Sequence, residues 1–221
     1  MPKSACIFGS TGLIGSYLKE QLLNDERYSR VIVFVRKELT LTHPKLVEVV
    51  GNYRQLESFS DKLITDEYYC CLGTTIKKAK TREAFKYVDY QLPMQIAQLA
   101  KKNEVKKYCI VSSIGASAKS NNFYLRTKGR MEEDISALGI ERLHFFRPSL
   151  LLGEREEQRF GEVASKVLMK IFGFLMLGGL RKYRAIHGEC VAQAMIAIAN
   201  KDITQKVFIS DEIEAISNEK T

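Results

Sequence analysis

The chain has 221 residues, of which 45% are hydrophobic, and its 34 lysines and arginines against 26 acidic residues give a formal charge of +8. This length and composition are typical of one globular domain with enough apolar side chains for a sizeable core. The longest apolar stretch, residues 167–180, is interrupted by Lys170 and three glycines. It is shorter than the roughly 20 residues that a membrane span needs, so no span is expected.

The cysteines and the amino-terminal residues indicate the cellular compartment of the protein. The first twelve residues hold a short apolar run, residues 5–8, without the longer apolar region and cleavage site of an export signal. The five cysteines are odd in number and show no CxxC spacing, and the adjacent Cys70 and Cys71 lie in an apolar run. This favours buried, reduced thiols. We therefore expect a cytoplasmic protein.

The sequence disfavours metal and nucleic-acid binding. His43, His144 and His187 have no cysteine or carboxylate partners at ligand spacing, so no metal is expected. The positive charge would suit nucleic acid, anionic lipid or a phosphorylated ligand. However, the basic residues fall in short scattered groups that acidic residues offset, which favours solvated faces. We expect no nucleic-acid partner and keep nucleic-acid binding only as an alternative.

The first 148 residues alternate short apolar runs with helical stripes. Strands are expected at residues 4–9, 30–36, 45–51, 67–73, 106–113 and 141–149, and helices at residues 13–22, 84–103 and 124–138. Pro93 is expected to bend the second helix, and Gly139 to end the third. Apolar strands that alternate with helices predict right-handed βαβ units. The expected fold is α/β, a Rossmann-type doubly wound parallel sheet with helices on both faces.

After Pro148 the pattern changes. Helices are expected at residues 158–177 and 188–200, and one late strand at residues 205–210. We interpret residues 1–148 as a cofactor-binding core and residues 149–221 as a small cap that completes a substrate cleft. Both belong to a single domain, because no flexible linker separates them.

A glycine-rich segment, GSTGLIG at residues 9–15, joins the first predicted strand to the first helix. A pyrophosphate needs such a loop because it must approach the backbone closely, accept exposed N–H groups and lie at the positive end of a helix. Tight turns also use glycine, but the flanking strand and helix favour dinucleotide binding. The expected cofactor contacts are Gly9, Ser10, Thr11, Gly12, Leu13, Ile14 and Gly15.

The end of the second predicted strand indicates which dinucleotide is bound. An NAD site places Asp or Glu there to hold the ribose 2′-hydroxyl, whereas this chain has Arg36 and Lys37. Arg36 can pair with a 2′-phosphate in a fork, and Lys37 adds a second charge. We therefore expect NADP(H) in preference to NAD(H); the alternative is a basic strand end in water.

The fourth predicted strand ends at the same edge of the sheet, in the segment CCLGTT. Gly73 would let the chain pass close to the cofactor, and Thr74 offers a hydroxyl group. A glycine turn without a ligand explains the segment equally well.

A serine, a tyrosine and a lysine are expected to converge near the nicotinamide end. Ser112 and Ser113 end the fifth strand, and Tyr124 and Lys128 stand four apart on one face of the next helix. A phenol is a weak acid with an ordinary pKa near 10, and a neighbouring ammonium stabilises its ionised form. The alternative is a surface pair on an amphipathic helix.

The segments GSTGLIG, VSS and YLRTK resemble the glycine loop, active-site serine and YxxxK pair of the short-chain dehydrogenase/reductase superfamily. The segments at residues 70–91, 111–133 and 147–162 look like its atypical subgroup, related to the human HIV-Tat-interacting, NADPH-binding oxidoreductase. The resemblance spans nearly the whole chain. It implies that Tyr124 is the general acid/base, that Lys128 binds the nicotinamide ribose, and that Ser113, or Ser112, holds the substrate oxygen.

The resemblance also extends the expected cofactor wall and marks two departures. Leu72, Gly73, Leu151 and Arg159 would complete the wall. Where many relatives place an Asp to meet the adenine, this chain has Asn52, and Asp89 stands where an Asn often supports a proton relay.

Two functions remain open from the sequence. The first is NADP(H)-dependent hydride transfer to or from a small carbonyl or alcohol, with Phe160, Phe172 and Phe174 lining a shallow pocket. The second is an NADP(H)-sensing regulatory protein with little turnover. The apolar helix at residues 171–177 could then contact a protein partner or form a homodimer, although a buried core helix is the alternative.

Overall fold

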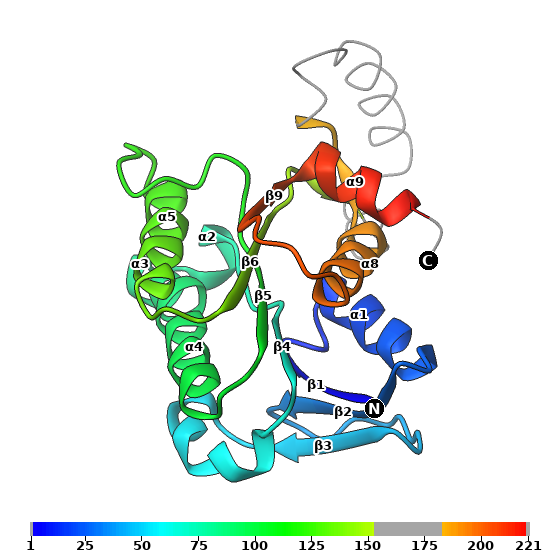
Figure 1. Cartoon of the computed structure of the whole chain (residues 1–221). Helices are drawn as coiled ribbons and strands as arrows, with labels where there is room; N and C mark the ends of the chain where they lie inside the picture. The colour runs from blue at the N-terminus through cyan, green and yellow to red at the C-terminus, as the bar shows by residue number, and fades with distance from the viewer. Residues whose placement is uncertain (1, 153–182, 220–221) are drawn as a thin grey trace.

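The computed structural model describes residues 2–152 and 183–219, and these form a seven-stranded parallel sheet with helices on both faces (Figure 1). The strands are β1 (Lys3–Phe8), β2 (Tyr28–Val35), β3 (Leu46–Val50), β4 (Glu67–Cys70), β5 (Lys107–Val111), β6 (Arg142–Arg147) and β9 (Val207–Ile209). They are ordered β3-β2-β1-β4-β5-β6-β9. Two short strands, β7 (Leu151–Leu152) and β8 (Ile186–His187), pair with each other in parallel.

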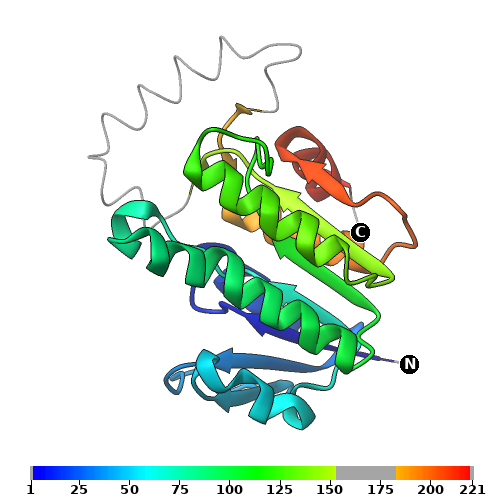
Figure 2. The same ribbon diagram turned by 90° about the vertical axis from the view of Figure 1, so that its left-hand side faces the viewer.

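The helices cover the sheet in two layers (Figure 1). They are α1 (Leu13–Asn24), α2 (Ile76–Ala79), α3 (Arg82–Lys86), α4 (Leu92–Lys102), α5 (Phe123–Ser136), α8 (Gly188–Ala199) and α9 (Ser210–Asn218), with a 3-10 segment η1 (Tyr53–Leu63) and a π-helical turn η2 (Tyr87–Gln91). One face of the sheet packs on α1, α8 and α9, and the other packs on η1, α4 and α5. The layer that contains α4 and α5 faces the viewer in Figure 2. Because the seven strands are parallel, their carboxyl ends all lie along one side of the sheet, which we call the open edge.

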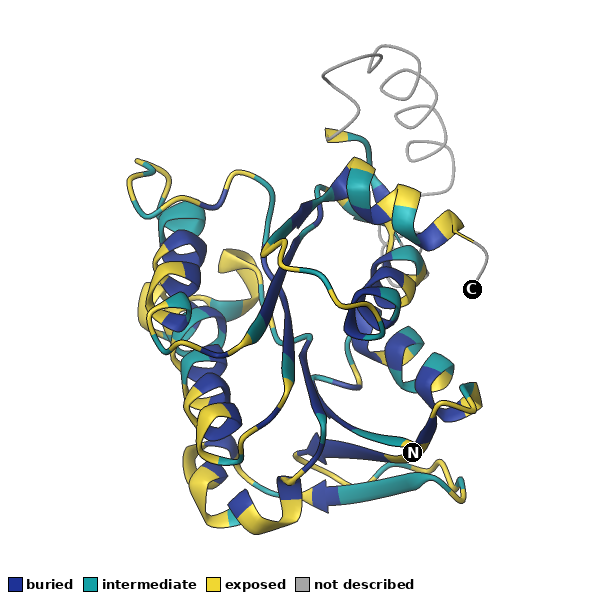
Figure 3. Cartoon of the chain, in the orientation of Figure 1, coloured by how far each residue is buried: buried dark blue, intermediate teal, exposed yellow. Residues whose placement is uncertain are grey.

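Strand β1 shows why the sheet lies at the centre of the fold. Ala5 and Ile7 pack into the core shared with α1 and α8, and Cys6 and Phe8 pack into the core on the opposite face. Side chains alternate between the two faces of a strand, so a strand with both faces buried is apolar throughout. Figure 3 shows this buried centre running between the two helical layers. The expected Rossmann-type fold is confirmed.

The structure adds two details to the sequence-based expectation. The helix expected at residues 84–103 is present as α3, the π-helical turn η2 and α4, which follow one another without a gap, and Pro93 lies in the first turn of α4. The expected late strand is β9, and it pairs with β6 and extends the main sheet. The helix expected at residues 188–200 is confirmed as α8, whereas that at residues 158–177 lies outside the described residues.

No helix within residues 2–152 and 183–219 is both long and apolar enough to cross a membrane.

Candidate functional site

Four neighbouring strands end in the segments that the sequence singled out. In the order β2, β1, β4, β5, the strands are followed by Arg36, Gly9, Cys71 and Ser112. Neighbouring strands lie about 4.8 Å apart, so these segments form one continuous row along the open edge of the sheet. Open α/β sheets bind their ligands at this edge.

The glycine loop is closed by contacts that exclude side chains. Gly9 has a positive φ of +90°, and a Cβ there would lie 2.9 Å from the carbonyl carbon of Cys71. A Cβ at Gly15 would lie only 2.1 Å from the carbonyl oxygen of Gly9, so α1 can start directly against the strand only with glycine at this position. The Gly12 N–H donates to Gly9 O at 3.0 Å. Glycine is required here to bring helix and strand together.

The loop keeps polar groups open for an anion. Gly12 precedes α1 and offers no side-chain cap to the N–H groups of the first turn, which begins with Leu13 and Ile14. The Ser10 hydroxyl is buried, and its oxygen has no hydrogen-bond partner in the described part of the chain. Thr11 is exposed beside it. An unpartnered hydroxyl and an uncapped helix end fit a phosphate group.

The basic pair lies immediately beyond β2. Phe8 and Phe34 are aligned across β1 and β2, so Arg36 follows its strand at the level where Ser10 follows Phe8. Arg36 and Lys37 are exposed, and neither forms an ion pair with a described residue. Asn52 is already engaged, because its side chain accepts the Arg54 N–H at 3.0 Å and caps η1.

The turn after β4 is hydrogen-bonded to the π-helical turn η2. The Thr74 N–H donates to Asp89 Oδ2 at 2.9 Å, and Leu72 is half-buried against the core shared with α4 and α5. Gly73 is exposed, and a Cβ there would lie 3.5 Å from Asp89 Oδ1. The turn therefore presents glycine backbone toward the open edge, directly above Asp89.

The two serines after β5 are in different environments. The buried Ser112 hydroxyl donates to Glu132 on α5, and Arg147 at the end of β6 donates through Nε to both oxygens of Glu132, at 3.0 and 3.1 Å. Ser113 is half-buried, and its hydroxyl makes only a long 3.5 Å contact with Ile114 O. Of the two serines, Ser113 is thus the one whose hydroxyl makes no strong hydrogen bond to a described residue. Glu132 lies one helical turn after Lys128, and its contacts with Ser112 after β5 and Arg147 on β6 were not predicted from the sequence.

Tyr124 and Lys128 lie on the buried side of α5. The side chain of Asn122 accepts the Tyr124 and Leu125 N–H groups at 2.9 and 3.2 Å and starts the helix. The Tyr124 ring packs against Phe85 with a centroid separation of 5.4 Å. Lys128 is buried, and its Nζ lies 2.8 Å from Asp89 Oδ1. The surface-pair alternative for Lys128 is therefore wrong.

Electrostatics keep the Lys128 ammonium charged. Burial alone lowers the pKa of Lys128, but the neighbouring charge of Asp89, followed by that of Tyr124, outweighs burial and raises the pKa. Lys128 is thus a buried cation with a raised pKa, one helical turn from Tyr124.

One expected cofactor contact, Leu151, does not follow any of these four strands. It is half-buried in β7 and packs against the core that contains α1 and α8. Arg159 lies outside the described residues, as do Phe160, Phe172, Phe174 and the apolar segment 171–177. The assignment of site residues as a whole stays a prediction.

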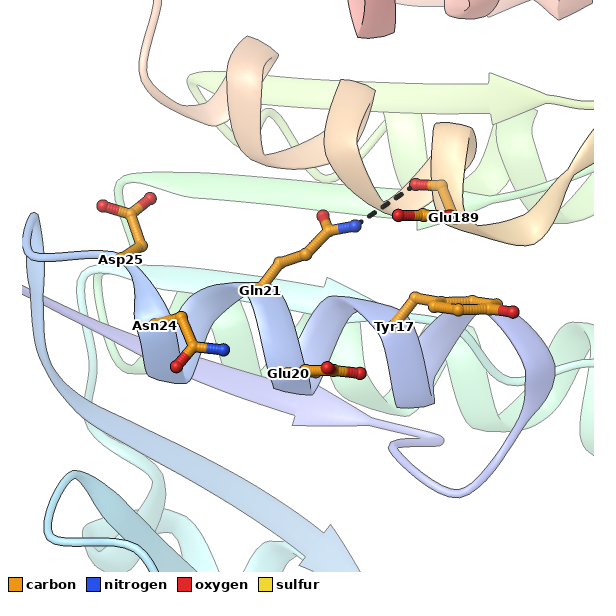
Figure 4. A pocket seen from close by; sticks show the side chains of 6 residues that line it. All are labelled: Tyr17, Glu20, Gln21, Asn24, Asp25 and Glu189. Atoms are coloured by element: carbon orange, nitrogen blue, oxygen red, sulfur yellow. Dashed lines mark hydrogen bonds between the residues drawn. The ribbon is translucent and has the colours of Figure 1, made fainter.

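A separate hollow lies between α1 and α8 (Figure 4). It has a volume of about 390 Å³ and is lined by Tyr17, Glu20, Gln21, Asn24, Asp25 and Glu189. The Gln21 amide reaches across to Glu189 O at 3.5 Å. None of the expected site residues lines this hollow, so it does not belong to the candidate site.

The chain matches the HIM1 family over residues 55–175. It is 33% identical to the rat protein HTATIP2 over 177 residues, which cover 78% of this chain and 72% of that protein. It belongs to the HIM1 family. Two mitochondrial FMP52 proteins also match: that of Debaryomyces hansenii is 31% identical, covering 91% of this chain and 90% of the relative, and that of Candida albicans is 33% identical, covering 97% and 98%.

Solved structures place this HIM1 chain in a wider fold group. The Bordetella bronchiseptica enzyme WbmH in complex with NAD+ superposes with a TM-score of 0.70 at 16% identity, covering 99% of this chain and 80% of WbmH. MoeE5 in complex with UDP-glucose and NAD gives 0.65 at 16% identity, covering 98% and 81%. At this identity the likeness concerns the fold. The relatives confirm the expected resemblance to HTATIP2, and the solved structures share the Rossmann-type fold.

The expectation of a cytoplasmic location is wrong, because the FMP52 relatives, matched over nearly the whole HIM1 chain, are named as mitochondrial proteins. The expectation relied on the lack of an export signal and on reduced cysteines. Neither property distinguishes the cytosol from a mitochondrial location.

Proposed function

We propose that this protein is an NADP(H)-dependent oxidoreductase that transfers hydride to or from a small carbonyl or alcohol. The observation that carries the proposal is the single row along the sheet edge, which runs from the basic pair through the glycine loop to Ser113 and the Tyr124–Lys128 pair. WbmH and MoeE5, which share the fold, are in complexes with NAD, and this supports a nicotinamide cofactor.

The chain's own residues would handle the proton and the orientation. The cofactor, when bound, supplies or accepts the hydride. Tyr124 would donate a proton to the carbonyl oxygen during reduction and remove it from the alcohol during oxidation. The Ser113 hydroxyl, free of a strong internal bond, would hold that oxygen in place. The Lys128 ammonium would stabilise the ionised tyrosine and bind ribose hydroxyls.

Replacement of Tyr124 by Phe tests the reaction. The Phe ring keeps the packing against Phe85, so NADPH binding measured by calorimetry should be unchanged. Turnover of a panel of small carbonyls should fall by about 10²–10⁴-fold, the usual contribution of a general acid/base. Tyr90→Phe is the matched control, because its hydroxyl bonds the exposed Asp134. If wild-type protein binds NADPH but turns over none of the panel, the cofactor-sensing alternative is favoured. If neither NADPH nor NADH binds, both functions are refuted.

Replacement of Arg36 by Ala tests the choice of cofactor. A hydrogen bond to a charged group contributes about 1.5–3 kcal/mol, which corresponds to roughly 10–100-fold in affinity. NADPH binding should weaken by that factor, and NADH binding should change little. Arg30→Ala, an exposed residue near the other end of β2, serves as the control. Equal loss for both dinucleotides would contradict a role in 2′-phosphate recognition.

We favour a small substrate and treat residues 149–221 as the proposed source of the substrate cap. MoeE5, which shares the fold and of which this chain covers 81%, is in complex with UDP-glucose.

We also propose that the protein acts in mitochondria, as the names of its FMP52 relatives suggest. Fractionation of cells that express the tagged full chain should recover it with mitochondrial markers. Recovery with cytosolic markers alone would refute this.

A further inference from the structure

Asp89 connects two parts of the candidate site that are distant in sequence. One of its carboxylate oxygens, Oδ2, accepts the Thr74 N–H at 2.9 Å, and the other, Oδ1, lies 2.8 Å from Lys128 Nζ. The side chains of Asp89 and Lys128 are only 1% and 3% exposed. A single buried carboxylate therefore joins the turn after β4 to the lysine of α5.

The local backbone explains how Asp89 comes to point there. Asp89 lies in the π-helical turn η2, and Pro93 follows four residues later in the first turn of α4. Proline has no N–H, so residue 93 cannot donate the usual helical bond to the carbonyl of residue 89. A π turn is one way to accommodate such an interruption, and π turns often occur at functional sites. Here the turn places Asp89 facing α5 and the end of β4.

Charge balance shows what Asp89 does for Lys128. A buried ammonium without a partner loses its proton easily, because burial lowers its pKa. The charged or titratable groups that face Lys128 are Asp89 from η2, Tyr124 from α5 itself and Cys70 from β4. Asp89 contributes most to the net raised pKa of Lys128. Lys128 therefore depends on Asp89 for its positive charge.

The ion pair also borders the open edge of the sheet. Gly73 is exposed, and a Cβ there would lie 3.5 Å from Asp89 Oδ1 and 4.0 Å from Lys128 Nζ. A side chain at residue 73 would therefore start in contact with the ion pair, at the turn that follows β4 in the row where the cofactor is proposed to lie.

We propose that Asp89 is a positioning residue of the reaction: it keeps Lys128 charged and in place beside Tyr124, and it fixes the Gly73–Thr74 turn against the cofactor. The inference rests on the proposed function for its consequence, but its electrostatic part can be measured without turnover. It assigns the buried carboxylate a role in setting the pH range of the site.

Asp89→Asn is the decisive variant, because Asn keeps an oxygen for the Thr74 N–H and removes the charge. Protein labelled with ¹³C at the lysine ε carbons is titrated by NMR, and the Lys128→Met variant identifies the Lys128 signal. In the wild type, Lys128 should stay charged to strongly alkaline pH. In Asp89→Asn its titration should move to lower pH, because only burial remains to act on it. Asp89→Glu should restore the wild-type titration, and Asp134→Asn, an exposed change on α5, should leave it unchanged.

Turnover provides the second readout. The Asp89→Asn variant should lose activity by about tenfold for each pH unit above the new Lys128 midpoint, while the wild type keeps its activity there. If Asp89→Asn does not fold, the neutral and smaller Asp89→Ser is titrated in its place. An unchanged Lys128 titration in the neutral variant would overturn the inference. If the Lys128 titration moves to lower pH in Asp89→Asn but the wild-type protein does not bind NADPH, the proposed function alone is refuted.

Discussion

Glu132 lies at the junction of three elements, and its replacement by Gln tests the packing of the site directly. The carboxylate comes from α5, accepts the Ser112 hydroxyl that follows β5, and pairs with Arg147 at the end of β6. Its side chain is 7% exposed, and that of Arg147 is 25% exposed. The substitution changes no shape but leaves the guanidinium without its countercharge.

The exposed fractions of these two side chains indicate how much Glu132→Gln should lower the free energy of unfolding. Removal of one partner from a buried ion pair typically costs about 3–5 kcal/mol, because the other charge stays buried. Water reaches part of Arg147, so we expect a loss of about 2–3 kcal/mol in the free energy of unfolding. For a chain of this length, 1 kcal/mol corresponds to roughly 2–4 °C, which predicts a melting temperature about 4–12 °C lower.

Urea unfolding followed by far-ultraviolet circular dichroism measures this loss, since the chain has no tryptophan to report by fluorescence. Glu133→Gln is the matched control, because Glu133 is the next residue on α5 and is exposed. It should change the free energy of unfolding by less than about 0.5 kcal/mol. Equal effects of the two substitutions would show that the Glu132–Arg147 pair contributes nothing to the fold, and the reasoning would fail.

Two further predictions concern the glycine loop and the buried thiols. Gly15→Ala should lower the free energy of unfolding, measured by thermal melts, by about 1–3 kcal/mol or more, because its Cβ would lie 2.1 Å from Gly9 O. The same substitution should weaken NADPH binding. Ser16→Ala, the next residue on the helix, is the control and should change neither stability nor binding. Burial raises the pKa of the Cys6 and Cys109 thiols well above 9.0 and that of Cys70 to about 11. The unfolded chain therefore releases protons that the folded chain keeps, so the stability present below pH 9 should fall as the pH rises through 9 to 11. Urea midpoints in reductant at pH 8 and pH 10.5 would check this, and equal midpoints would contradict it.

The fold could be predicted because its signals are local. β1 and β2 are continuous apolar runs, and a strand buried on both faces has this composition whatever its neighbours are. The late strand at residues 207–209 was also foreseen as a strand. Its pairing with β6 was not, because pairing joins residues far apart in sequence, such as Phe146 and Phe208.

The candidate site was predictable in part for the same reason. Gly9 and Gly15 are marked by their spacing after a strand, and the four-residue step from Tyr124 to Lys128 places both on one helical face. The interruption at Asp89 was foreseen only as a bend at Pro93. Spacing could not show that a π turn would aim the Asp89 carboxylate at Lys128.

Glu132 illustrates the limit of such signals. Its position four residues after Lys128 puts it on the same face of α5, but a carboxylate at that spacing is usually a surface residue. Only the packing of β6 beside β5 brings Arg147 to it. The partner is thus set by sheet order, which no single segment encodes.

The two carboxylates suggest why this site contains buried charge at all. A buried ion pair recovers little of what its desolvation costs, so Asp89–Lys128 and Glu132–Arg147 are poor explanations of stability as such. Each pair, however, fixes a segment at the open edge: Asp89 holds the turn after β4 through the Thr74 N–H, and Glu132 holds the residue after β5 through the Ser112 hydroxyl. Asp89 pairs directly with Lys128, whereas Glu132, four residues after Lys128 on α5, pairs with Arg147. Apolar side chains could fill the same volume, but they could not hold a lysine charged or leave Ser113 as the free hydroxyl. These two ion pairs therefore contribute mainly by fixing the positions of Lys128, Thr74 and Ser112, and contribute less to the stability of the fold.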